Sequence, residues 1–156
     1  MKGHLAEMMG RHAGVGRLDW IGLRAERRGT VATPMQVAIT PDGLAGDHAS
    51  AGKRAVTLIQ AEHLPVIAAL SGQDAVAPAL LRRNLLISGI NLAALRKAQI
   101  AVGDVILQIE GPCPPCSRME EVLGPGGYNA MRGHGGWYAS VIQPGEIGLG
   151  DPVRPA

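Results

Sequence analysis

The sequence predicts a mainly β fold, either a barrel or a sandwich, decorated with a few short helices. Gly (22) and Pro (11) are frequent among the 156 residues, and both interrupt regular elements, so we expect many turns and short strands. Short β-branched segments such as 55–59 lie between these turns. Phe is absent and aromatic residues make up 3%, so Val, Ile, Leu, Ala and Met must build the core.

Apolar patterns place the individual elements along the chain. The expected strands lie near 18–24, 31–40, 55–59, 85–87, 100–102, 105–109, 137–143 and 146–149. The expected helices lie near 60–70, 117–123 and 128–132. Ser117 is the expected N-cap of the second helix, and Glu120 three residues later would complete a capping box. Residues 1–16 are expected to form a loose arm and 17–156 a single domain.

Charge and hydropathy argue against several classes of function. The net charge of +2 is too small to indicate nucleic-acid binding. No apolar run approaches the ~18 residues that a membrane helix needs, so we expect no membrane partner. The first twenty residues lack the apolar core of a secretory signal. We therefore expect a cytoplasmic protein, in which a structural disulfide would be unusual.

The segment Cys113-Pro114-Pro115-Cys116 is the most informative motif in the sequence. Two thiols at this spacing are compatible with a redox pair, with half of a zinc site, or with one working cysteine beside a bystander. They are equally compatible with two small buried side chains on a proline-rich turn. A second Cys pair to complete a zinc site is missing, and the surrounding elements do not alternate as in thioredoxin-like proteins.

Cys116 is the better candidate of the two thiols for a nucleophile or metal ligand. It directly precedes the expected N-cap Ser117, where the positive end of the helix dipole would favour a thiolate. Arg118 adds a nearby cation, whereas Cys113 lies between two prolines and lacks such support.

Basic residues precede two of the expected core strands. Arg82-Arg83-Asn84 comes before 85–87, and Lys53-Arg54 before 55–59. If these strand ends meet at one rim of a barrel, the guanidinium groups would suit an anion such as phosphate. The Asn84 amide could recognise a heterocycle or fix a loop. Ordinary surface cations at strand ends would give the same pattern.

Two glycine-containing motifs are further candidates. Gly46-Asp47-His48 could bind a metal, shuttle a proton or simply cap a turn. Gly133-His134-Gly135-Gly136 would let the backbone approach a ligand closely, or serve as a flexible hairpin connection.

An ordered set of motifs between residues 17 and 153 resembles the MOSC family, named for the C-terminal domain of molybdenum cofactor sulfurase. In chain order, the motifs are Gly43-Leu44-Ala45-Gly46-Asp47-His48, Arg54-Ala55-Val56-Thr57-Leu58-Ile59, Arg82-Arg83-Asn84-Leu85, Gly89-Ile90-Asn91-Leu92, Gly103-Asp104-Val105, Gly111-Pro112-Cys113-Pro114-Pro115-Cys116, Gly136-Trp137-Tyr138-Ala139 and Gly145-Glu146-Ile147-Gly148-Leu149-Gly150-Asp151.

The resemblance implies a barrel-like β fold with a cofactor cleft. Cys116 matches the family's functional thiol, which carries sulfur as a persulfide or binds the molybdenum of the molybdenum cofactor. Arg82 and Arg83 match positions that hold the phosphate of the pterin, and Asn84, Arg54 and His48 are further cofactor-binding candidates. Soft thiolate chemistry agrees with the role implied for Cys116.

Two functions follow from this resemblance. In the first, the domain binds molybdenum cofactor and reduces N-hydroxylated substrates, with electrons from a reductase partner. In the second, Cys116 accepts sulfur from a cysteine desulfurase and passes it on, with Cys113 available to release it. The 156 residues leave no room for the pyridoxal-phosphate desulfurase domain of full sulfurases or the additional β-barrel domain of reductase relatives.

Overall fold

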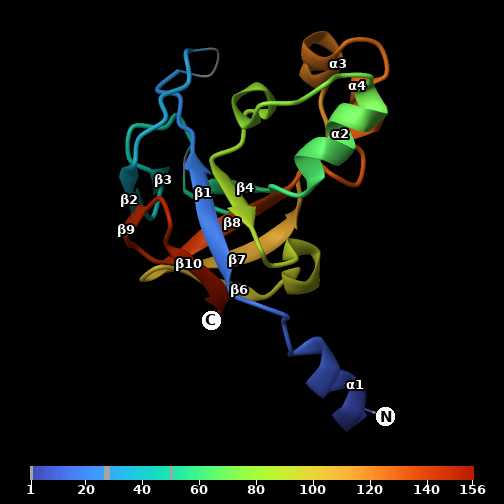
Figure 1. Cartoon of the computed structure of the whole chain (residues 1–156). Helices are drawn as coiled ribbons and strands as arrows, with labels where there is room; N and C mark the ends of the chain where they lie inside the picture. Colours follow the sequence, from blue (N-terminus) through green and yellow to red (C-terminus); the bar gives the residue numbers. More distant parts are fainter. Residues whose placement is uncertain (1, 27–28, 50) are drawn as a thin grey trace.

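A closed seven-stranded β-barrel forms the centre of the computed structural model (Figure 1). The structure describes residues 2–26, 29–49 and 51–156. The order of strands around the barrel is β1-β10-β6-β7-β8-β4-β5. Their bounds are Gly16–Ile21 (β1), Val56–Gln60 (β4), Leu85–Ser88 (β5), Gln99–Val102 (β6), Val105–Pro112 (β7), Trp137–Gln143 (β8) and Pro152–Pro155 (β10). The prediction of a mainly β, barrel-like fold is confirmed.

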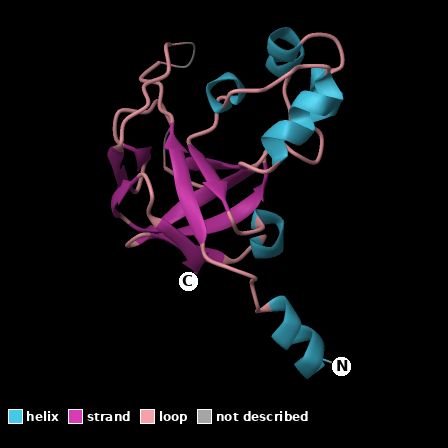
Figure 2. Ribbon diagram, viewed as in Figure 1, coloured by secondary structure: helices cyan, strands magenta, loops and turns pink. Residues whose placement is uncertain are grey.

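A small second sheet and several helices surround the barrel (Figure 2). The sheet has the order β3-β2-β9, with bounds Gln36–Thr40 (β2), Gly43–Leu44 (β3) and Gly145–Gly148 (β9). The α-helices are Lys2–Met9 (α1), His63–Ser71 (α2), Ser117–Leu123 (α3) and Gly127–Met131 (α4), and two 3₁₀ turns cover Pro78–Leu81 and Leu92–Leu95. None of the helices in the described part of the chain is long and apolar enough to cross a membrane.

β4 and β5 are parallel, whereas the other neighbouring strands of the barrel pair antiparallel. Two parallel strands need a crossover connection, and here it contains α2 and the turn Pro78–Leu81. The chain then returns to β5 through Arg82-Arg83-Asn84, at the end of the barrel where α2, α3 and α4 gather (Figure 1). The connection therefore brings the predicted basic motif to the helical end of the barrel.

Two apolar clusters explain the continuous apolar runs of β4 and β5. Leu58, Leu85 and Ile87 belong to the core inside the barrel. Ile59 and Leu86 point the other way, into a second cluster that the helices cover. Both faces of these strands are buried, so their sequences do not alternate between apolar and polar residues.

The buried side chain of Asn84 joins three separate segments of the chain. Its Oδ1 accepts hydrogen bonds from the backbone N (3.0 Å) and the Oγ1 (3.1 Å) of Thr57 on β4. Its Nδ2 donates to the Gly22 carbonyl (3.1 Å) after β1 and to Oδ2 of Asp47 (3.3 Å). The amide therefore fixes the end of β1, the start of β4 and the loop at Asp47 relative to β5.

The start of α3 differs from the predicted capping box. Cys116, not Ser117, is the N-cap of α3, and its side chain makes no capping hydrogen bond. Glu120 instead accepts hydrogen bonds from the backbone N of Gly126 (3.1 Å) and Tyr128 (3.0 Å), at the start of α4. The capping box prediction was wrong because α4 follows closely enough for its free amides to reach the same carboxylate.

Part of the N-terminal segment is helical. Residues 2–9 form α1, which stands away from the barrel in Figure 1. The side chains of Leu5, Met8 and Met9 are exposed on it.

We predict that Asn84→Ala lowers the free energy of unfolding by about 2–3 kcal/mol, since it leaves buried polar groups without partners. Asn84→Asp should be more destabilising at neutral pH, because its carboxylate would face Asp47. Chemical denaturation measures both effects. Asn129→Ala, at an exposed site, is the matched control and should change stability by less than about 0.5 kcal/mol. An Asn84→Ala protein as stable as this control would contradict the prediction.

We also predict that the start of α4 loosens in acid. Hydrogen bonds from the Tyr128 and Gly126 amides lower the pKa of Glu120 from 4.5. A lowered pKa means that the contribution to stability is complete above 4.5 and is lost as the pH falls through the lowered value. Glu120 should therefore protect these two amides from hydrogen exchange at neutral pH, and this protection should be lost as the pH falls through the lowered pKa.

Glu120→Gln should remove this pH dependence, whereas Glu121→Gln, at the exposed neighbouring position, should leave it unchanged. Equal protection of the two amides in wild type and Glu120→Gln at neutral pH would contradict the prediction.

Candidate functional site

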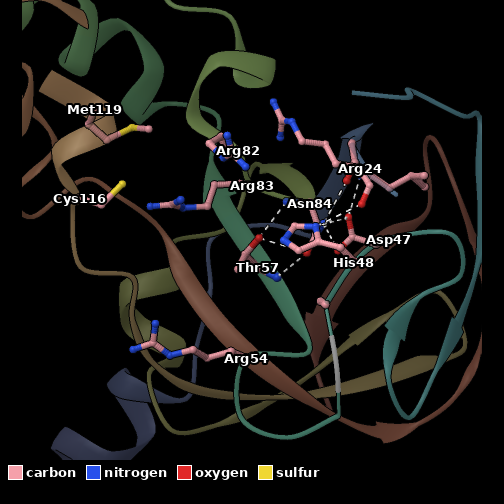
Figure 3. Close-up of a pocket in the computed structure, with 13 residues that line it drawn as sticks. Arg24, Asp47, His48, Arg54, Thr57, Arg82, Arg83, Asn84, Cys116 and Met119 are labelled. Carbon is pink, nitrogen blue, oxygen red and sulfur yellow. Dashed lines mark hydrogen bonds and ion pairs between the residues drawn. The ribbon is translucent and has the colours of Figure 1, made fainter. Parts of the chain in front are cut away.

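A cavity of about 350 Å³ opens at the helical end of the barrel (Figure 3). Its lining comes from the end of β1, the loop at 47–49, the start of β4, the turn before β5, and α3 with its N-cap. The lining residues are Gly22, Leu23, Arg24, Asp47, His48, Ala49, Arg54, Thr57, Arg82, Arg83, Asn84, Cys116 and Met119. All six site residues predicted from the sequence thus line one cavity, which we call the arginine cavity.

The consecutive residues Arg82 and Arg83 both line the arginine cavity because of an unusual backbone conformation. Arg82 has a φ of 61°, the left-handed region, at the end of the turn Pro78–Leu81. In an extended chain, successive side chains point to opposite faces, and this turn breaks that alternation. The left-handed conformation costs a non-glycine residue roughly 1–2 kcal/mol. Such strain is common at functional sites.

Backbone carbonyls fix the guanidinium group of Arg83. Its Nε donates to the Gly135 carbonyl (2.7 Å) and its Nη1 to the Leu81 carbonyl (2.9 Å). Gly136 allows the glycine segment to pack this closely, since a Cβ there would overlap the Leu58 carbonyl of β4. The Gly133-His134-Gly135-Gly136 motif therefore approaches β4 and Arg83 and supports one wall of the arginine cavity.

Arg54 and Arg24 add two further cations to the arginine cavity. The guanidinium carbon of exposed Arg54 lies 4.7 Å from the centroid of the Tyr138 ring, a cation–π contact.

Arg24 donates from Nη2 to the Ala79 carbonyl (2.7 Å). Burial lowers the pKa of Arg24 from its ordinary value, and the neighbouring cation Arg118 lowers it further, while Asp47 opposes the change. Guanidinium groups stay charged in proteins, so the lining carries four cations.

Asp47 and His48 lie at the Arg24 side of the arginine cavity (Figure 3). The Asp47 side chain is 4% exposed, and its Oδ1 accepts a hydrogen bond from the backbone N of Arg24 (2.8 Å). The His48 side chain is 41% exposed, with Nδ1 3.1 Å from the Arg24 carbonyl oxygen. Asp47 therefore organises the loop, and His48 remains accessible from the arginine cavity.

The two cysteines line different cavities. Cys116 is exposed and lines the arginine cavity. Cys113 is half-buried and lines a second cavity of about 280 Å³ together with His63, Arg96 and Trp137. Burial raises the pKa of the Cys113 thiol, and nearby Arg83 and Arg54 offset this only in part. Cys113 is therefore a protonated thiol at neutral pH, whereas Cys116 is the thiol that a ligand of the arginine cavity can reach.

The described residues contain no group of three or more His, Cys, Asp and Glu side chains that could hold a metal ion. The zinc interpretation of the Cys pair therefore finds no partner ligands in this part of the chain. The described residues therefore offer Cys116 no complete set of protein ligands for a metal ion.

Sequence reasoning missed Arg24, Thr57 and Met119 as members of the arginine cavity. Arg24 belongs to no motif, and only the fold brings it next to the turn before β5, at Ala79. Thr57 and Met119 were expected to pack within a strand and a helix. Thr57 near the start of β4 and Met119 in the first turn of α3 both line the arginine cavity.

Comparisons with known proteins agree with this architecture. The family model described as "MOSC domain" matches residues 45–154. YuaD from Bacillus subtilis has a similar structure, with a TM-score of 0.79, 18% sequence identity, and coverage of 90% of this chain and 94% of that one. No curated protein sequence matches the chain.

Two YiiM structures are also similar. For YiiM from Escherichia coli the TM-score is 0.69 at 23% identity, covering 90% of this chain and 69% of that one. For YiiM from Geobacillus stearothermophilus the TM-score is 0.70 at 17% identity, covering 90% and 75%. At these identities the likeness concerns the fold alone. Because the family model spans well over half of its residues, the chain belongs to the MOSC domain family, which is associated with the binding of molybdenum cofactor.

Proposed function

We propose that the chain binds molybdenum cofactor in the arginine cavity, with the Cys116 thiolate as a ligand of the metal. The observation that carries the proposal is the opening of one exposed thiol and four guanidinium groups into the same cavity. Thiolate is the ligand type that soft metal centres prefer, and guanidinium groups bind phosphate. The donor set therefore fits both ends of a cofactor that carries a metal and a phosphate.

Arg82 and Arg83 would hold the phosphate. The backbone bonds of Arg83 keep its guanidinium in place before any ligand arrives, so little conformational entropy is lost on binding. Arg24 and Arg54 would add to the positive potential, and Asp47 is the single carboxylate among the described lining residues. An anion would relieve the mutual repulsion of these cations.

When bound, the cofactor would supply a redox-active metal. We infer that the domain then reduces N-hydroxylated substrates with electrons from a reductase protein. Cys116, which is exposed and lines the arginine cavity, would hold the metal. Cys113, which lines the second cavity, takes no part in binding the metal.

Exposure of Cys116 also favours a second candidate function, the transfer of sulfur. A desulfurase partner would have access to this thiol and could leave a persulfide on it. The persulfide would add about 32 Da to the mass of the chain.

Metal analysis of protein made in a host that synthesises molybdenum cofactor tests the first function. We expect close to one molybdenum per chain in wild type and in Cys113→Ala, and almost none in Cys116→Ala. Equal molybdenum in Cys116→Ala and wild type would contradict the ligand role. If wild type holds no molybdenum but Cys116 carries the persulfide mass, the chain is a sulfur carrier instead.

Two substitutions at Arg82 separate its charge from its backbone strain. Arg82→Gly and Arg82→Ala both remove the cation, so both should lower molybdenum occupancy to the same extent. Only glycine adopts the left-handed conformation without cost, so Arg82→Gly should be more stable than Arg82→Ala by about 1 kcal/mol in chemical denaturation. Unchanged occupancy in both variants would remove Arg82 from the cofactor site.

A further inference from the structure

We propose that His48 takes up a proton when an oxyanion binds in the arginine cavity, and that its Nε2–H then donates a hydrogen bond to the bound anion. The inference rests on the proposed function, because it requires that the arginine cavity binds an anionic group. It adds a protonated imidazole as a hydrogen-bond donor at the Arg24 side of the arginine cavity.

One hydrogen bond fixes the tautomer of the His48 ring. Nδ1 lies 3.1 Å from the carbonyl oxygen of Arg24, and a carbonyl oxygen can only accept. We therefore assign the hydrogen of the neutral ring to Nδ1, which leaves the lone pair on Nε2. The backbone N of His48 donates to the same oxygen at 2.8 Å. Two contacts with one carbonyl therefore fix both the backbone and the ring of His48.

The ring remains open to the arginine cavity, which it lines. Its side chain is 41% exposed, and no described residue hydrogen-bonds to Nε2. The neutral ring can therefore accept a proton from solvent at Nε2 while Nδ1 keeps its bond to the Arg24 carbonyl. Protonation requires no rearrangement of the loop.

Several ionisable groups line the arginine cavity with His48. Oδ1 of Asp47 lies 3.8 Å from Nδ1. The other ionisable lining groups are Arg24, Arg54, Arg82, Arg83 and the thiol of Cys116.

A dianion bound in the arginine cavity would add an attractive partner for the imidazolium. Protonation of His48 and binding of the anion therefore strengthen each other, and thermodynamic linkage makes the effect reciprocal.

Sulfate is the probe for the first test, since it remains a dianion between about pH 6 and pH 8, where histidine titrates. Isothermal titration calorimetry of the full chain, made in a host without molybdenum cofactor, gives proton uptake when buffers of different ionisation enthalpy are compared. For wild type we expect proton uptake with sulfate, and an affinity that rises as the pH falls. One coupled proton limits this rise to about tenfold per pH unit.

His48→Asn is the diagnostic variant. Its side-chain amide can still donate to the Arg24 carbonyl, but Nε2 is gone, so sulfate should bind without proton uptake and without pH dependence. His4→Asn, on α1 away from the barrel, is the matched control and should behave as wild type (Figure 1). Proton uptake in His48→Asn equal to that of wild type would overturn the assignment to His48.

Nitrogen NMR of the histidine rings in wild type keeps the inference testable even if His48→Asn does not fold. The free protein should show hydrogen on Nδ1 of His48, and sulfate should shift the ring towards the imidazolium pattern. A free ring with hydrogen on Nε2, or sulfate binding that leaves the ring neutral, overturns the inference while the proposed function stands. Failure of wild type to bind sulfate overturns the inference and the anion site together.

Discussion

The hydrogen bonds of the buried Asn84 amide are the constraint on which the site depends. They join Thr57 on β4, the Gly22 carbonyl after β1 and the Asp47 carboxylate, three segments that are far apart in the sequence. Asp47 in turn binds the backbone N of Arg24. The amide thus has all of its polar atoms occupied, which makes it a structural support for the arginine cavity more than a group free to bind a ligand.

Two of the arginines, Arg24 and Arg83, are fixed in place by the backbone around them. Carbonyl oxygens of Leu81, Gly135 and Ala79 accept hydrogen bonds from Arg83 and Arg24. Without such bonds, long cationic side chains would move apart into solvent. Because they are fixed, their repulsion is built into the folded protein, and an anion that relieves it gains affinity without reorganising the site.

Several features followed from the sequence, and others did not. The apolar runs at 55–59 and 85–87 predicted β4 and β5, because both strands are buried on both faces. The capping box at Ser117 failed, since a sequence pattern does not reveal that α4 offers better donors to Glu120. β10 (Pro152–Pro155) was missed because its proline-bounded sequence is atypical of a strand, and pairing with β1 and β6 closes the barrel there.

The sequence by itself determined the β class, the order of the MOSC motifs, and the candidate thiol and arginines, because these depend on residue type and local spacing. Only the tertiary structure decided which of these residues share a cavity. It placed Cys116 in the arginine cavity and Cys113 in another, and it added Arg24. It also fixed the orientation of His48 through a carbonyl 24 residues away in the chain. These contacts arise from closure of the barrel and from the crossover between parallel strands, which join residues that no local pattern relates.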